Sequence, residues 1–193
     1  NNQLTTLDLS QNTALTSLSC DGNQLTTLDL SNNTALTSLD CSYNQLTTLD
    51  LSQNTALTSL NCNGNQLTTL DLSQNTALSY LNCSYNQLTT LDLRNGNNIN
   101  MYTWRLNITN NYNLYCIDVD DASWSNANWT VANQNTSRWN SFSNNCASEI
   151  YGCTDSTATN YDPTATLNYA CDYGMTYVPD DAFEQALIYL GYD

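Results

Sequence analysis

Aspartate recurs at a fixed spacing in the first half of the chain, and regularly placed carboxylates could form a catalytic pair. Asp8, Asp29, Asp50, Asp71 and Asp92 are each 21 residues apart. If each interval is one turn of a coil, consecutive carboxylates stack roughly 5 Å apart, which is the separation in retaining glycosidases. Catalysis also needs two carboxylates in unlike environments within a pocket. Five equivalent carboxylates on an exposed wall do not meet this need, so we expect no enzyme.

The same column of aspartates predicts a response to pH. Carboxylates roughly 5 Å apart lie within the ~8 Å screening length at physiological salt, so their repulsion should raise their pKa values. Raised pKa values in the folded state predict a stability that falls as pH rises through the acid range. Calcium or high salt should then relieve part of the repulsion.

The overall composition excludes several function classes. The chain has no His, no Lys and no glycine-rich phosphate loop, so the commonest general base and the nucleotide cradle are missing. The net charge is −15, with 16 Asp and two Glu against three Arg. Nucleic acid is an unsuitable partner because phosphate binding needs clustered Lys and Arg. The sequence contains no run of about 18 apolar residues, which is the length needed to span a membrane.

The eight cysteines fall into two groups. One group recurs every 21 residues, at Cys20, Cys41, Cys62 and Cys83. We predict that these four are buried free thiols behaving as small hydrophobes, because one cysteine per coil does not give zinc its converging ligands. The other four lie in loop-rich sequence, where a small core needs disulfides. Sequence order and segment boundaries favour the pairs Cys116–Cys146 and Cys153–Cys171.

A repeat of 21 residues positions these side chains. Residues 4–24, 25–45, 46–66 and 67–87 follow one another without insertion, each with a half like LTTLDLSQNTA and a half like LTSLxCxxNQ. Alternation along L-x-L or L-x-C turns every second side chain inward. One coil cannot bury that set alone, so neighbouring coils must stack.

Asparagine marks the points where each coil turns. The two columns are Asn12, Asn33, Asn54 and Asn75, and Asn23, Asn44, Asn65 and Asn86. An inward Asn there can bond backbone groups that the bend leaves unpaired, at a cost of roughly 1–3 kcal/mol each if lost. After Asp92 the repeat decays, and Gly96 stands where the next asparagine is expected.

The motif L-x-x-L-x-L-x-x-N with this spacing resembles the leucine-rich repeat, over residues 1–115. The nested 10+11 units with cysteine are similar to those of secreted Bacteroidetes proteins. The resemblance implies a β-rich solenoid, a right-handed coil of short parallel strands, cut from a longer chain. Residues 116–149 resemble the C-terminal cap of such domains. We expect Trp104, Trp124, Trp129 and Trp139 to cover the last coil; the alternative is an aromatic platform for sugars.

From Gly152 onward, GCTDSTATNYDP resembles a short spacer module of surface proteins from the same bacteria, and we assign residues 150–174 to it. It contains oxygen ligands of the kind that calcium prefers, namely Asp155, Asn160, Asp162 and Asp172. The alternative is that they form ordinary solvated turns. No other cofactor is expected.

Two further features of this region come from resemblance and periodicity. Asp155-Ser156-Thr157 resembles the acceptor for O-glycosylation in Bacteroidetes, which predicts attachment at Ser156. In residues 175–193, Phe183, Leu187 and Leu190 share one face of a predicted amphipathic helix. This helix resembles the opening helix of a further repeat domain.

Comparing the repeats with one another predicts which side meets a ligand. The LTTLDLSQNTA half is almost invariant, whereas the other half varies. The candidate binding residues in the variable half are Asp40, Tyr43, Asn61, Tyr80, Asn82 and Tyr85. Tyr43 and Tyr85 lie two coils apart, roughly 10 Å, which suits a sugar chain or a protein loop; the alternative is drift on a solvated face.

These observations predict a non-catalytic extracellular scaffold for adhesion or for protein or glycan binding. It would belong to a larger cell-surface protein exported by a Gram-negative bacterium, with neighbouring modules of the same chain beside it. The alternative is a purely structural spacer or stalk in a modular surface protein or filament.

Overall fold

The computed structural model describes residues 2–101, 105–137, 140–168 and 171–173. Residues 1–148 and 149–193 form two compact units. The predicted C-terminal helix and two of the four cap tryptophans, Trp104 and Trp139, lie outside the described residues. Within the described residues, no helix has the length and apolar character needed to cross a membrane.

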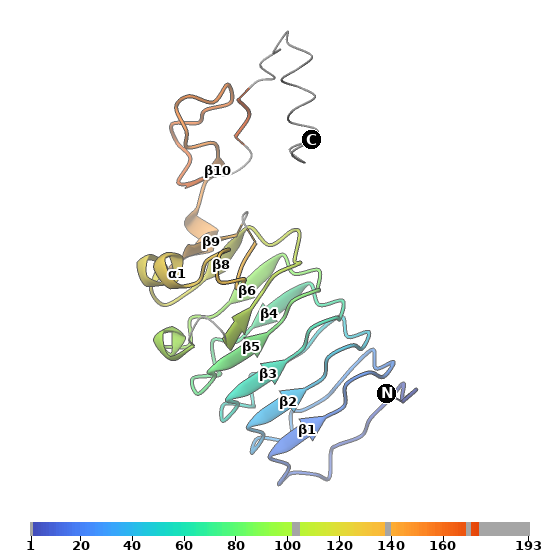
Figure 1. Cartoon of the computed structure of the whole chain (residues 1–193). Coiled ribbons are helices and arrows are strands. Elements are labelled where there is room, and N and C mark those ends of the chain that lie inside the picture. Colours follow the sequence, from blue (N-terminus) through green and yellow to red (C-terminus); the bar gives the residue numbers. More distant parts are fainter. Residues whose placement is uncertain (1, 102–104, 138–139, 169–170, 174–193) are drawn as a thin grey trace. The chain divides into compact units, whose positions relative to one another are not determined.

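The first unit is a β-solenoid, in which short strands stack coil upon coil (Figure 1). One sheet has the order β1 (Ser17–Ser19), β2 (Ser38–Asp40), β3 (Ser59–Asn61), β5 (Tyr80–Asn82) and β7 (Leu106–Asn107). The other has the order β4 (Thr69–Asp71), β6 (Thr90–Asp92), β8 (Cys116–Asp118) and β9 (Ser141–Ser143). All of these pairs are parallel, and between repeats the register joins equivalent residues such as Leu39 and Leu60. The predicted solenoid of short parallel strands is confirmed.

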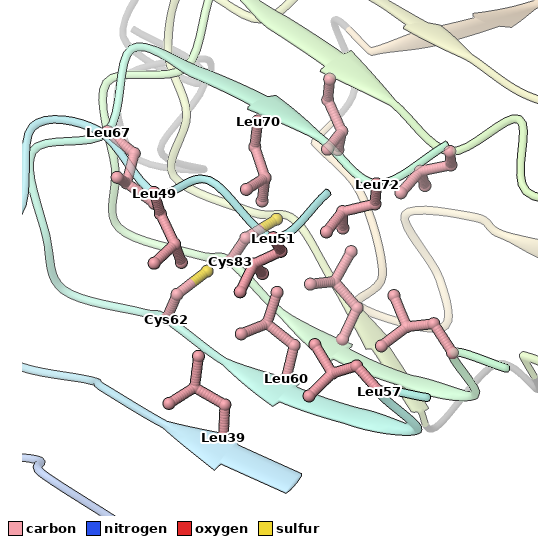
Figure 2. Packing of buried hydrophobic residues seen from close by; sticks show 14 of the residues in the cluster. Leu39, Leu49, Leu51, Leu57, Leu60, Cys62, Leu67, Leu70, Leu72 and Cys83 are labelled. Carbon is pink, nitrogen blue, oxygen red and sulfur yellow. The ribbon is translucent and has the colours of Figure 1, made fainter. Parts of the chain in front are cut away.

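Leucine and cysteine side chains fill the interior between the two sheets (Figure 2). Leu60 in β3 and Leu70 in β4 are buried, as is Cys62 just after β3. Each buried leucine contributes about 1.5–3 kcal/mol, and neighbouring coils share the same cluster. The four repeat cysteines are free and buried, as predicted. Burial raises the pKa of Cys20 to about 11 and that of Cys83 to about 12, so these thiols remain protonated and unreactive.

From Asn33 and Asn44 onward the asparagines of both columns are buried, but the two columns bond differently. The Nδ2 group of Asn65 donates to the carbonyls of Cys41, Cys62 and Asn63, and its Oδ1 accepts from the Leu46 amide. Asn54 donates to two carbonyls, and its Oδ1 finds no protein donor among the described residues. The second column therefore satisfies more backbone groups than the first.

The expectation that Gly96 interrupts the first column is corrected by the structure. Asn95, one residue earlier, is buried and donates from Nδ2 to the carbonyl of Asn75. Asn95 lies two residues after Leu93, whereas Asn75 lies three after Leu72. The turn after Leu93 is thus one residue shorter than in the earlier coils, and Gly96 takes the left-handed conformation with φ of +75°.

The cap closes the array after β7 with a short helix, α1 (Ala122–Asn128), and the strand β9. Asp121 accepts from the Trp124 amide and caps the helix N-terminus. Trp129 is 1% exposed, packs against Trp124 and Phe142, and donates from its indole nitrogen to the Met101 carbonyl. This agrees with covering of the last coil by tryptophan.

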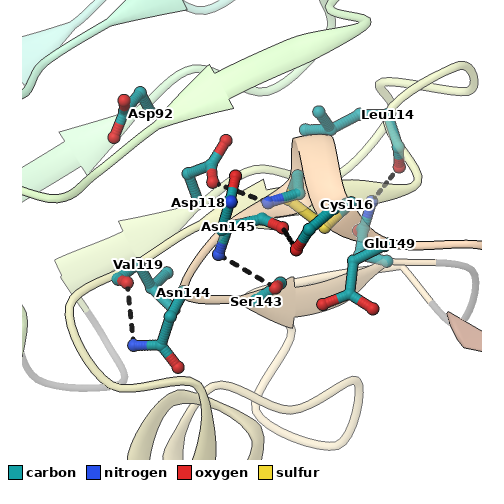
Figure 3. The surroundings of a disulfide bond; sticks show 12 residues. Asp92, Leu114, Cys116, Asp118, Val119, Ser143, Asn144, Asn145 and Glu149 are labelled. Atoms are coloured by element: carbon teal, nitrogen blue, oxygen red, sulfur yellow. Dashed lines mark hydrogen bonds between the residues drawn. A yellow bond between two sulfur atoms is a disulfide. The ribbon is translucent and has the colours of Figure 1, made fainter. Parts of the chain in front are cut away.

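The disulfide Cys116–Cys146 joins β8 to the 3-10 helix η3 (Cys146–Ser148), as predicted. Figure 3 shows Cys116 with Asp118, whose Oδ1 accepts from the Cys146 amide at 2.8 Å. A second 3-10 helix, η1 (Asn98–Asn100), precedes the cap, and the Asn98 amide Nδ2 donates to the Leu93 carbonyl. The cap is therefore held by a covalent bond as well as by packing.

In the second unit, the described residues form a small loop-rich module. The parallel pair β10 (Tyr151–Gly152) and β11 (Leu167–Asn168) makes its sheet. The predicted disulfide Cys153–Cys171 closes the module. Covalent closure is what such a short segment needs in place of a large core.

Candidate ligand-binding face

The variable halves of the repeats come together on the sheet β1-β2-β3-β5-β7 and on the turn that follows each of its strands. We call this surface the variable face. Asp40, Asn61 and Asn82 are register neighbours at the ends of β2, β3 and β5. Tyr80 opens β5 beside Ser59. All six candidate binding residues therefore lie on one face.

The polar residues at the strand ends have one side-chain oxygen engaged in the turn. The Oδ1 atom of Asn82 accepts from the amide and hydroxyl of Ser84, at 3.2 and 2.7 Å. Asp40 makes the same pair of bonds with Ser42. Nδ2 of Asn61 donates to Oδ2 of Asp40 at 3.1 Å, which links two coils. These half-buried groups are thus held in fixed orientations.

Two tyrosines protrude from the turns of the variable face. Tyr43 is 66% exposed and Tyr85 is 63% exposed. Both have the left-handed backbone conformation, with φ of 52° and 53°. Gly22 and Gly64 occupy the same turn in alternate coils with φ of 62° and 65°. Since the turn demands a positive φ, glycine is the unstrained choice there.

The glycine of one coil makes room for the tyrosine of the coil before it. A Cβ atom at position 64 would lie only 2.9 Å from Cδ1 of Tyr43. The ring of Tyr43 therefore rests on the backbone of Gly64 with its outer face open to solvent. This packing limits the freedom of the ring, which lowers the entropy that a ligand must remove.

The variable face continues further toward the cap than the sequence indicated. Asn107 follows Asn82 in register, and its Oδ1 bonds the amide and hydroxyl of Thr109 as in the earlier coils. Asn110 continues the column of left-handed residues with φ of 58°. The Leu106-x-Ile108 rhythm is the sequence signal for this extension, but the candidate residues stopped at Tyr85.

The aspartate column runs onto the other sheet at β4 and β6, and the expected rise in pKa is wrong for Asp8, Asp29 and Asp50. A hydrogen bond from the Ser52 amide, helped by the Ser52 hydroxyl, lowers the pKa of Asp50. Asp8 and Asp29 have lowered pKa values for the same reason, with Ser10 and Ser31 as donors. Repulsion from Asp29 raises the pKa of Asp50 but is the weakest influence on it. Local turn bonds therefore outweigh neighbour repulsion.

At the cap end, the column gains a sixth carboxylate and a cation. Asp118 in β8 is the register partner of Asp92 in β6. Arg94 forms an ion pair with Asp92 and lies 3.6 Å from Asp118. Burial raises the pKa of Asp92, but hydrogen bonds and charge from Arg94 reverse this and leave the pKa lowered. The column is partly neutralised at this end.

In the second unit, the candidate calcium ligands are engaged in turns. Oδ1 of Asp155 accepts from the Thr157 amide and hydroxyl, and Oδ1 of Asp162 does so from Thr164. Oδ1 of Asn160 accepts from the amide of Asp172. Among the described residues, no three His, Cys, Asp or Glu side chains are grouped to hold a metal. Calcium binding stays a prediction.

The candidate glycosylation residue is Ser156. It is exposed and lies in a turn of the second unit. Accessibility is what a modifying enzyme needs, but attachment at Ser156 also stays a prediction.

Comparison with known proteins identifies part of the array. Residues 34–75 match a family model described as Leucine Rich repeats (2 copies). The chain is also similar to a solved structure titled "Functional domain of InlJ from Listeria monocytogenes includes a cysteine ladder", with 35% identity and a TM-score of 0.49. That similarity covers 61% of this chain and 29% of the other. A search of curated proteins found no match.

Proposed function

We propose that this protein is a non-catalytic scaffold of leucine-rich repeats that binds an extended protein or glycan ligand along its variable face. The observation that carries the proposal is the backbone conformation of Tyr43 and Tyr85. Each is held at a positive φ where alternate coils have glycine. Such strain costs on the order of 1–3 kcal/mol per residue, so retention of the tyrosines indicates that their rings are used.

The chemistry of the variable face suits recognition by stacking and hydrogen bonding. An exposed tyrosine offers a large, rigid and amphipathic surface of the kind that is enriched in interfaces. Tyr43 and Tyr85 are two coils apart, roughly 10 Å along the array. Oriented amides and a carboxylate lie at the strand ends nearby, at Asn61, Asn82 and Asp40. A linear ligand could therefore contact two rings and the polar groups between their coils.

The proposed setting is the outside of a cell, as part of a larger surface protein exported by a Gram-negative bacterium. Two disulfides support this setting because such bonds persist in oxidising compartments. Adhesion is the role that we infer for a module of this kind, with neighbouring modules of the same chain extending it from the surface.

The test is a binding screen of the whole chain against protein and glycan arrays. We expect the wild type to bind at least one ligand on the arrays. The double variant Tyr43→Gly/Tyr85→Gly should lose this binding, because glycine keeps the turn and removes both rings. The matched control is Gln53→Ala/Gln74→Ala, which removes exposed side chains from the invariant half. If the wild type binds nothing on either array, or if the tyrosine variant binds equally well, the proposal fails and the spacer interpretation replaces it.

A further inference from the structure

A pocket of about 610 Å³ lies beside the last coil of the variable face, where that coil meets the cap. Three amide side chains line it, from Asn107, Asn110 and Gln134. Its volume is within the range of roughly 300–1,000 Å³ that is typical of small-molecule sites. The pocket lies entirely within the first unit.

The remaining lining groups are mostly hydroxyls. They come from Thr109, Thr136 and Ser137, and Val131 adds an apolar surface that is 54% exposed. Amides and hydroxyls both donate and accept hydrogen bonds. Among the lining residues that the structure describes, none has a charged side chain, in a chain whose net charge is −15. The described lining thus combines hydrogen-bonding groups with apolar surface and carries no charge.

We propose that this pocket binds a neutral sugar residue. The hydroxyls of a sugar are paired donors and acceptors, as are the amides and hydroxyls of the lining. An acidic sugar would meet no cation among the described lining residues and would be repelled by the net charge of the chain. A peptide anchored by an aromatic or arginine side chain would need an apolar or acidic pocket, and the lining offers only one valine and no carboxylate.

The backbone around the pocket is strained in the way that binding sites often are. Among the described residues, four non-glycine residues have positive φ, and two of them, Asn110 and Gln134, line this pocket. Their φ values are 58° and 59°. The conformation costs free energy that glycine would avoid, so the two amides are held there despite the strain.

The pocket and the tyrosines can be tested separately because they use different side chains. The probes are immobilised neutral hexose and N-acetylhexosamine oligosaccharides, with sulfated and uronic-acid counterparts and a peptide library for comparison. The variant Asn110→Gly/Gln134→Gly removes two amides and relieves strain, so it should fold. We expect the wild type to bind a neutral oligosaccharide. The affinity of this variant for the same oligosaccharide should be lower by a factor of roughly ten or more.

Two more variants define the outcome. Val131→Trp fills the pocket from an exposed position and should also abolish binding, whereas the control Gln53→Ala/Gln74→Ala, on the invariant half of the repeats, should leave the pocket's affinity unchanged. The proposal is overturned if no neutral oligosaccharide binds, if an acidic one or a peptide binds better, or if both pocket variants bind like the wild type. Loss of binding in Tyr43→Gly alone would place the sugar on the tyrosines and likewise overturn the pocket site.

Discussion

At the scale of single residues, two asparagines of the same array should differ in their contribution to stability. Asn65 bonds three carbonyls and one amide, whereas Asn54 bonds two carbonyls. Replacement of Asn65 by Ala should cost about 2–4 kcal/mol, because several buried backbone groups lose their partners. Asn54→Ala should cost less. Urea unfolding of both variants checks the order, and an equal or reversed loss would contradict it.

A second prediction at this scale concerns Asp50 and pH. Its folded-state pKa is lowered by the Ser52 bonds, so the unfolded state takes up its proton first as pH falls. The stabilisation is present above the unfolded pKa and is lost as pH falls through the folded one. Asp50→Asn should therefore flatten the dependence of melting temperature on pH between about pH 5 and pH 2.

The control for this experiment is Gln53→Ala, an exposed neighbour that should leave the pH slope unchanged. A melting temperature that rises as the wild type is acidified from neutral pH would mean that carboxylate repulsion dominates after all. In that case high salt should also stabilise the wild type, because it screens the repulsion. If the turn hydrogen bonds dominate, no stabilisation by salt is expected.

At the scale of elements, the two disulfides should stabilise different parts of the chain. Cys116–Cys146 closes 30 residues that include α1 and β9, and such a loop contributes about 2–4 kcal/mol. Cys116→Ser/Cys146→Ser should open the cap and admit protease within residues 120–145. Cys153→Ser/Cys171→Ser is the matched control, and its cleavage should stay within the second unit. Mass spectrometry of the fragments distinguishes the two patterns.

The elements that could be predicted are those whose pattern repeats. Each coil restates the same inward leucines, so the strands, the buried cysteines and the stacking followed from the sequence. The helix α1 did not, because its seven residues are too few to show an apolar period. Asp121, three residues before the amide that it caps, was the available signal. Asn95 was missed because the turn after Leu93 is one residue shorter, which shifts this asparagine out of the 21-residue period.

The binding face was only partly predictable for a similar reason. Differences between repeats pointed to Tyr43 and Tyr85, since both stand out against glycine in an otherwise regular array. The pocket beside the cap joins residues of β7 and its turn to residues 131–137, and no repeated motif relates these segments. Contacts between a repeat and a unique segment depend on tertiary packing, which periodicity does not encode.

At the scale of the whole molecule, burial is uneven along the solenoid, and this should set the order in which its coils open. Leu4 is 45% exposed whereas its counterpart Leu25 is 0% exposed, and Cys20 is 6% exposed whereas Cys62 is 0% exposed. Arrays with nearest-neighbour contacts open most readily where a coil buries least. Under native conditions, Cys20 should therefore be alkylated well before Cys62, while all four repeat thiols should react together in denaturant. Peptide mass spectrometry of pulse-labelled protein measures the order; simultaneous native labelling would contradict it.

The packing of Tyr43 on Gly64 means that the array has two different repeat lengths, one for its core and one for its exposed rings. A single coil is enough to extend the core, because every coil buries the same leucines. The ring of Tyr43, however, lies where a Cβ atom of residue 64 would otherwise be, so Tyr43 and Gly64 form a couple, whereas Asn110 takes the same turn position in the coil after Tyr85. Gene duplication by one coil would place tyrosine upon tyrosine, whereas duplication by two would lengthen the core and copy the ring together with its glycine. Growth of the recognition surface would then proceed in steps of two coils, although the fold itself permits steps of one.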